Sequence, residues 1–166
     1  MNSRLIQTVA FTGHRTYRNQ ASDALRQTIE ELCSMGFNTF LCGMAVGFDM
    51  EAADALLQIR EKNPSYQIQL IAVLPYCAQS EHYNTTQKAQ YNRIIEAADS
   101  VVEISTSYRK ECYMMRNNFL VENSSVVVAW YDGRGRSGTH HTISRAKSLH
   151  RRIINLYPQA QTEFEF

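Results

Sequence analysis

Apolar and polar positions in this chain follow two periods in turn, which predicts strands that alternate with helices. Short continuous runs of apolar residues, typical of strands buried on both faces, are separated by longer segments with apolar residues every three or four positions. The predicted strands are residues 5–12, 37–42, 68–74, 101–104, 125–131 and 152–156. The predicted helices are residues 21–36, 84–98 and 110–122, and two that follow glycine turns and run to about residues 62 and 150.

Glycine and proline mark several ends of these elements. Gly36 is a natural stop for the first helix, and Pro75, which cannot donate to a strand ladder, ends the third strand. Apolar strands that alternate with helices predict a doubly wound α/β fold, with a mainly parallel sheet covered on both faces. We expect one three-layer domain over residues 1–157, followed by a loosely ordered tail over residues 158–166.

The chain is organised around residues 39–54, which predict a buried strand, a glycine turn and the start of a helix. Gly43 and Gly47 would let the backbone turn sharply and approach a ligand, while the first free amides of the helix face an anion. Asp49, in the first helical turn, has two interpretations. It either interacts with the helix dipole or accepts hydrogen bonds from ribose hydroxyls.

A second glycine loop, residues 132–139, lies between the fifth strand and the last helix. Its three glycines can form a nest of amides for a phosphate, with Gly138 at the helix start and a hydroxyl from Thr139. No G-K-[ST] sequence follows, so the loop is not a P-loop and ATP hydrolysis is disfavoured.

Two further groups of polar residues are candidates for ligand binding. Gly13, His14 and Arg15 follow the first strand, where an arginine fork and a histidine can meet a phosphate or carboxylate. Arg116 and Asn117 lie within an otherwise amphipathic helix, where a surface arginine would be the default interpretation.

Composition restricts the partners of the protein. At 166 residues and 44% hydrophobic composition, the chain can bury the core of one domain. A net charge of +1 gives no overall attraction to polyanions, so nucleic acid is an unlikely partner and phosphate recognition must be local. No apolar run approaches the roughly 20 residues that span a bilayer, so we expect a cytoplasmic protein without a membrane partner.

Cysteine and histidine positions do not predict a metal site or a required cofactor. The four cysteines contain no C-x-x-C pair and are expected to be reduced core thiols: Cys33, Cys42, Cys77 and Cys112. His140 and His141 are adjacent, so they point to different sides of a helix and make a poor pair of metal ligands.

Four motifs in the same order resemble the YpsA-like family. They are Thr12-Gly-His-Arg15, Cys42-Gly-Met-Ala-Val-Gly-Phe-Asp49, Met115-Arg-Asn117 and Ser137-Gly-Thr139. This family belongs to the SLOG superfamily of Rossmann-like domains, with the Lonely Guy phosphoribohydrolases and the core of DNA-processing protein A. The resemblance covers residues 5–157 and implies a nucleotide-type ligand, such as an ADP-ribose-like signal, together with a homodimer.

The chain departs from the pattern of the Lonely Guy enzymes. In those enzymes, glutamates follow the P-G-G-x-G-T loop, and one of them works with an arginine to break an N-glycosidic bond. Arg116 resembles that arginine in its place, but the residues after Thr139 are His-His-Thr-Ile. Because a carboxylate can stabilise the oxocarbenium-like state of glycosidic cleavage, the mechanism would need Asp49 or Glu81 as a substitute.

The sequence leaves three functions open. The leading hypothesis is a sensor or regulatory domain that binds a nucleotide derivative, with phosphate on both glycine turns, Arg15 and Arg116 as charge partners, and Asp49 on ribose. The alternative is a phosphoribohydrolase-type N-glycosidase. A third function, binding of single-stranded DNA, depends on the DNA-processing resemblance and the basic residues of 145–152, and the near-neutral charge disfavours it.

Overall fold

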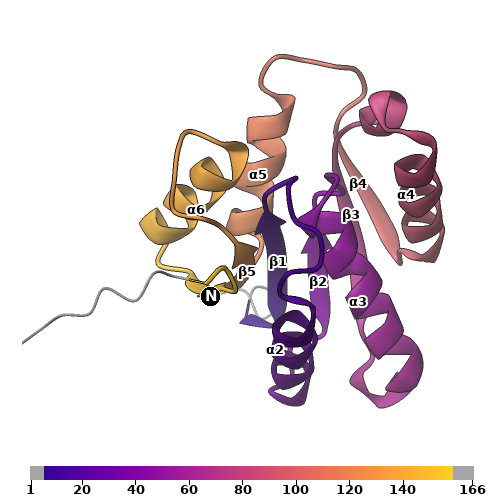
Figure 1. Ribbon diagram of the computed structural model, residues 1–166, viewed down its shortest axis with the longest axis vertical. Coiled ribbons are helices and arrows are strands. Elements are labelled where there is room, and N and C mark those ends of the chain that lie inside the picture. The colour runs from indigo at the N-terminus through magenta and orange to yellow at the C-terminus, as the bar shows by residue number, and fades with distance from the viewer. Residues whose placement is uncertain (1–5, 159–166) are drawn as a thin grey trace, which may run out of the picture.

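The computed structural model describes residues 6–158, which form a six-stranded sheet between two layers of helices (Figure 1). All strand pairs are parallel, in the order β4-β3-β2-β1-β5-β6. The Rossmann-like, doubly wound α/β architecture predicted from the sequence is therefore confirmed. Apart from Pro158, the predicted tail lies outside the described residues.

The strands are β1 (Thr8–Gly13), β2 (Thr39–Cys42), β3 (Gln69–Tyr76), β4 (Ser100–Ser105), β5 (Val126–Trp130) and β6 (Arg152–Asn155). The α-helices are α2 (Ser22–Ser34), α3 (Phe48–Lys62), α4 (Thr85–Ala97), α5 (Cys112–Glu122) and α6 (Gly138–Ser148). Two short 3₁₀ turns, η1 (Pro64–Tyr66) and η2 (Gln79–His82), flank β3. Each predicted strand and helix is present, and most ends shift by one to three residues.

One predicted end is wrong, because β3 continues through Pro75 to Tyr76. The pairing of β3 with β2 ends at Ala72, whereas its pairing with β4 continues to Tyr76. Pro75 therefore lies where β3 has one neighbouring strand, and a missing amide can be accommodated there as it is on an edge strand.

Side chains of the strands alternate between two apolar layers. Val9 and Phe11 of β1 pack in the cluster that contains α2, α3 and α4, whereas Ala10 between them packs with α5. β5 repeats this pattern, with Val126 and Val128 on the first face and Val127 on the other. Both faces of the sheet are thus buried, which explains why its strands are continuous apolar runs.

The strand order reverses at β1, and this reversal positions a binding site. β1 pairs with β2 on one side and with β5, which comes much later in the chain, on the other. In parallel sheets, the connections leave such a point in opposite directions and open a crevice beyond the carboxyl ends of the strands. The segments that follow β1 and β5 therefore meet at the same rim.

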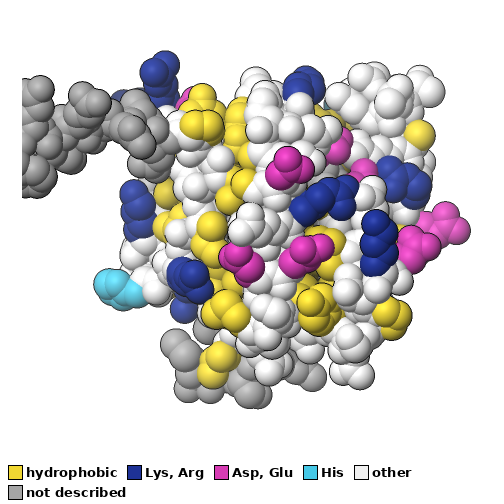
Figure 2. Space-filling view, turned by 60° about the horizontal axis from the view of Figure 1, so that its bottom comes forward, with side chains coloured by type: hydrophobic (Ala, Val, Ile, Leu, Met, Phe, Trp, Pro, Cys, Tyr) yellow, Lys and Arg dark blue, Asp and Glu magenta, His cyan; other side chains and the backbone are white. Residues whose placement is uncertain are grey.

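The surface away from this rim carries mixed charges. Figure 2, in which the lower end of Figure 1 comes forward, shows lysine and arginine interspersed with aspartate and glutamate. Ion pairs such as Arg60 with Asp99, at 3.0 Å, join charges of opposite sign. Within the described part of the chain, no helix is long and apolar enough to cross a membrane.

The cysteines are all free thiols, and one of them differs from the prediction. Cys33, Cys42 and Cys112 are buried, as expected for core thiols, but Cys77 is exposed after the end of β3. Its sulfur lies 3.3 Å from the carbonyl oxygen of Thr106.

Candidate functional site

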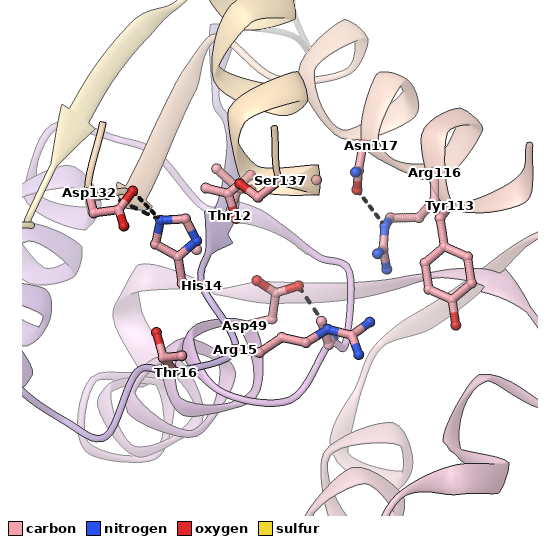
Figure 3. A pocket seen from close by; sticks show the side chains of 14 residues that line it. Thr12, His14, Arg15, Thr16, Asp49, Tyr113, Arg116, Asn117, Asp132 and Ser137 are labelled. Atoms are coloured by element: carbon pink, nitrogen blue, oxygen red, sulfur yellow. Dashed lines mark hydrogen bonds and ion pairs between the residues drawn. The ribbon is translucent and has the colours of Figure 1, made fainter. Parts of the chain in front are cut away.

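A cavity of about 430 Å³ opens at the carboxyl ends of β1, β2 and β5 (Figure 3). Its walls come from the loop after β1, the first turn of α3, one face of α5 and the first residues of α6. Gly43 and Gly47 do not line it, and the other predicted ligand-binding residues do: Gly13, His14, Arg15, Asp49, Arg116, Asn117, Gly138 and Thr139. The structure thus gathers residues from four separated motifs around one space.

Gly13 and Gly47 allow the loop after β1 to lie directly on the start of α3. A Cβ atom on Gly13 would overlap the side chain of Phe48, and one on Gly47 would lie 2.6 Å from the carbonyl oxygen of Arg15. Gly47 also has φ +86°, a conformation that disfavours other residues. The amide of Phe48 donates to the carbonyl of His14 at 3.3 Å. The two glycines therefore serve contacts within the protein.

Gly43 makes room for Arg116. A Cβ atom at Gly43 would lie 2.7 Å from Nη1 of Arg116, and the carbonyl oxygen of Gly43 accepts a hydrogen bond from that nitrogen. The same carbonyl accepts from Nε2 of Gln79 at 2.9 Å. The glycine turn predicts a close approach to a ligand, but the space beside Gly43 is filled by the guanidinium group of Arg116.

Arg116 is buried, contrary to the default interpretation of a surface arginine, with 5% of its surface exposed. Its Nε donates to Oδ1 of Asn117 at 2.8 Å, and its guanidinium carbon lies 5.6 Å from the ring centroid of Tyr113. A guanidinium group always carries its charge. Arg116 therefore places a fixed positive charge in the wall of the cavity.

Asp49 is a buried carboxylate in the same cavity, with 5% of its surface exposed. Burial raises the pKa of Asp49 to about 6, against the opposing effects of Arg116 and the Ala45 amide. That amide donates to Oδ2 of Asp49 at 3.3 Å, and the side chain does not cap α3. A carboxylate with one long hydrogen bond retains acceptor capacity for hydroxyl groups of a ligand.

His14 and Asp132 form a pair on the opposite wall from α5 (Figure 3). Nε2 of His14 lies 3.0 Å from Oδ1 of Asp132 and 3.1 Å from the amide nitrogen of the same residue. Nε2 cannot donate to the carboxylate and accept from the amide at once, and the ionised carboxylate favours donation. In that tautomer, Nδ1 is a hydrogen-bond acceptor.

The amide of Arg134 strengthens this arrangement by lowering the pKa of Asp132, to which it donates at 2.9 Å. Asp132 was not among the residues singled out in the sequence. Asp132 is the second residue after β5. Only the strand order, in which β5 pairs with β1, shows that it lies opposite the segment that follows β1.

The first turn of α6 is the part of the cavity best suited to an anion. Ser137 caps the helix by accepting from the amide of His140 at 3.1 Å. The amides of Gly138 and Thr139, the first two of the helix, have no acceptor within the helix, and the helix dipole adds positive potential there. Gly138 lines the cavity, and an added Cβ there would meet only Nδ2 of Asn117, at 3.5 Å, so the space beside this residue is open.

The residues after Thr139 do not supply a carboxylate. Thr142 and Ile143 are buried in α6, while the side chains of His140 and His141 contact Tyr131 and Asn118. Glu81, weighed as a substitute from the sequence, does not line the cavity, whereas Asp49 does. Among the side chains of residues 6–158, no group of three histidines, cysteines or carboxylates could hold a metal ion.

The chain is similar in sequence to a curated relative and in fold to solved structures, with low sequence identity in each case. The uncharacterized SPbeta prophage-derived protein YoqJ of Bacillus subtilis is 26% identical over 158 residues, 86% of this chain and 91% of YoqJ. DNA processing protein A of Streptococcus pneumoniae is 22% identical, with a TM-score of 0.69, over 95% of this chain and 52% of that chain. The molybdenum cofactor binding protein of Rippkaea orientalis is 17% identical, with a TM-score of 0.58, over 93% of this chain and 78% of that chain.

These comparisons differ in what they establish. At this level of identity, the two solved structures show the fold alone, and the chain spans about half the length of the DNA-processing protein. The model of the YspA SLOG family, in contrast, matches residues 9–161. That match covers most of the sequence, and the chain therefore belongs to the YspA SLOG family, in agreement with the resemblance of its four motifs.

Proposed function

We propose that this protein is a binding or sensing domain for a phosphorylated ribose compound, such as a nucleotide or an ADP-ribose-like derivative. One observation carries the proposal: a single cavity combines two helix amides that have no acceptor within the helix, a buried arginine and a buried carboxylate. These groups match the phosphate and the hydroxyls of such a ligand.

The phosphate is assigned to the first turn of α6. Amides at a helix N-terminus bind phosphate through hydrogen bonds and the helix dipole. Gly138 and Thr139 provide the amides, and Thr139 adds a hydroxyl to the cavity wall. Arg116 and the exposed Arg15 supply positive charge across the same space.

The start of α3 is a poorer phosphate site than the start of α6. The sequence predicts phosphate on both glycine turns, and we now propose it for the turn before α6 alone. The first amide of α3, from Phe48, already donates to His14, and the carboxylate of Asp49 repels an anion. Asp49 is suited instead to accept hydrogen bonds from the ribose hydroxyls, as acidic residues do in dinucleotide-binding folds. The ligand would therefore run from α6 toward α3.

A second function, hydrolysis of an N-glycosidic bond, is favoured by the pairing of His14 with Asp132. A histidine oriented by a carboxylate can act as a general base toward water, and Asp49 could stabilise a positively charged sugar. Release of free base from a nucleoside monophosphate, with loss of that release in Asp49→Asn, would support this function. If free base is released no faster than in buffer, hydrolysis is refuted and binding is the remaining function.

Binding of single-stranded DNA is a third function, because a neighbour in fold is a DNA-processing protein and the same cavity could accept a backbone phosphate. The basic segment after residue 144 gives it little support. Arg145 pairs with Glu122 at 3.2 Å, and Nε of Arg151 donates to the carbonyl of Val121 at 3.0 Å. An oligonucleotide that competes with a mononucleotide would extend the proposal to nucleic acid.

Isothermal titration against ribose 5-phosphate, nucleoside monophosphates, ADP-ribose and inorganic phosphate tests the proposal. The variants are Arg116→Gln, which removes the buried charge, and Gly43→Ala, whose Cβ displaces the unaltered guanidinium. The matched control is Arg152→Gln, because Arg152 is exposed on β6 and does not line the cavity.

Both cavity variants should weaken binding of phosphorylated ribose compounds by about 10-fold or more, the effect of one charged hydrogen bond. The control should bind like the original protein, and far-ultraviolet circular dichroism should show that all variants are folded. Absence of binding by every phosphorylated ribose compound, or equal binding by Arg116→Gln, would overturn the proposed function.

A further inference from the structure

Three tyrosines form a cluster beside the cavity, at the end of α5 that lies away from its phosphate site. The ring of Tyr76 lies edge-on to Tyr108 and Tyr113, with centroid distances of 5.7 and 6.3 Å. Tyr113 belongs to the cavity wall, and Tyr108 lies on the connection from β4 to α5, which crosses the upper part of Figure 1. We call Tyr76, Tyr108 and Tyr113 the tyrosine cluster.

One face of α5 joins this cluster to the phosphate site. Tyr113 and Asn117 are four residues apart, and Tyr113 and Arg116 are three apart, so all three side chains lie on the same face of the helix. Figure 3 shows them in sequence along the cavity wall. Asn117 approaches Gly138 at the phosphate end, and Tyr113 lies one helical turn, about 5.4 Å of axis, further along.

The tyrosine cluster and the residues next to it also expose apolar surface to solvent. Tyr108 has 65% of its surface exposed. Met114 and Met115, which follow Tyr113 in α5, have 54% and 43% of their surfaces exposed. Tyr76 is nearly buried and anchors the other two rings. An edge-to-face pair covers one face of only one of its two rings, so the exposed ring of Tyr108 can still stack on another planar ring.

We propose that the tyrosine cluster binds the planar base of the ligand, so that the protein recognises a nucleotide rather than a sugar phosphate alone. This inference rests on the proposed function, because it uses the phosphate and the ribose to position the base. The base stacks on the cluster next to Tyr113, on the side of the cavity away from α6. Recognition there depends on ring area and makes little distinction among bases, because every base has an aromatic face.

The test compares adenosine 5'-monophosphate with ribose 5-phosphate, which differ by the base. Their affinity ratio should be about 5-fold to 150-fold in the original protein, the range that stacking of one base produces. Tyr113→Leu and Tyr108→Leu should each reduce this ratio toward one. Tyr108→Leu should leave the affinity for ribose 5-phosphate nearly unchanged, because Tyr108 does not line the cavity. Tyr113→Leu also removes the ring beside the Arg116 guanidinium, so for this variant the ratio of the two affinities is the readout.

Tyr113→Phe is the matched control, because it retains the ring and loses only the hydroxyl, and it should keep the original ratio. A ratio near one in the original protein, with ribose 5-phosphate bound, would overturn this inference and leave the proposed function intact. A high ratio that survives Tyr113→Leu and Tyr108→Leu would also overturn it. If neither compound binds, the proposed function itself fails.

Discussion

Gly138→Ala separates ligand binding from folding in this protein. The added Cβ would lie 3.5 Å from Nδ2 of Asn117, an ordinary contact distance, and Gly138 is the first residue of α6 and is not among the glycines with a positive φ. Replacing glycine by alanine at a position with a compatible backbone stabilises a protein by about 0.4–1 kcal/mol, because it lowers the conformational entropy of the unfolded chain. The variant should therefore be as stable as the original protein or more stable, with a rise in Tm of about 1–4 °C.

Ligand binding should change in the opposite direction. The new methyl group points toward Asn117, into the space where a phosphate oxygen would accept from the Gly138 amide at about 2.9 Å. Loss of one hydrogen bond to a charged group costs about 1.5–3 kcal/mol. The affinity for a nucleoside monophosphate should fall about 10-fold to 150-fold.

Two assays are sufficient, differential scanning calorimetry for Tm and isothermal titration for affinity. A second glycine variant, Gly36→Ala, is a useful comparison, because Gly36 has φ +97° and lies after α2, away from the cavity. It should lose stability and keep its affinity. If Gly138→Ala binds the nucleotide within twofold of the original protein, phosphate does not lie on the first turn of α6.

Two further predictions concern stability. Because burial raises the pKa of Asp49 from 3.8 to about 6, the folded protein holds this proton more tightly than the unfolded chain, so stability falls as pH rises through that window. Asp49→Asn should therefore raise the free energy of unfolding in urea by up to ~3 kcal/mol near neutral pH and change it little near pH 4. Equal stability of the variant and the original protein at neutral pH would show that burial of the ionised Asp49 carboxylate does not destabilise the fold. Gly47→Ala should lower the free energy of unfolding by about 1–3 kcal/mol or more, because it combines φ +86° with a 2.6 Å approach to the Arg15 carbonyl; urea unfolding checks this, and a change below about 0.5 kcal/mol would contradict it.

The sequence was sufficient to predict the fold because the same apolar pattern is repeated in successive strands. Residues such as Val9, Ala10 and Phe11 are all apolar because both faces of the sheet are covered, and that pattern distinguishes a parallel sheet from a solvated one. Pro75 misled the prediction because its tolerance depends on where β2 ends, which is a property of the pairing.

The site was predictable in its location and less so in its detail. Glycine turns after strands indicated the rim at which the cavity lies, but only the packing shows that Gly43 accommodates Arg116 and that Gly47 accommodates the backbone of Arg15. Buried Arg116 donates to the carbonyl of Gly43, 73 positions away in the chain, and no local pattern records such a contact. Asp132 was missed for the same reason, because its partner His14 is 118 residues distant in the chain.

In the proposed complex, the amides at the start of α6 bind the phosphate of a nucleotide. Amide chemical shifts of the ¹⁵N-labelled protein, followed during titration with adenosine 5'-monophosphate, report on these hydrogen bonds residue by residue. We predict that the amide protons of Gly138 and Thr139 move downfield, as they form hydrogen bonds to the phosphate, and that those of residues on the far side of the sheet do not move. Saturable binding that shifts other amides and leaves these two unchanged would contradict the claim.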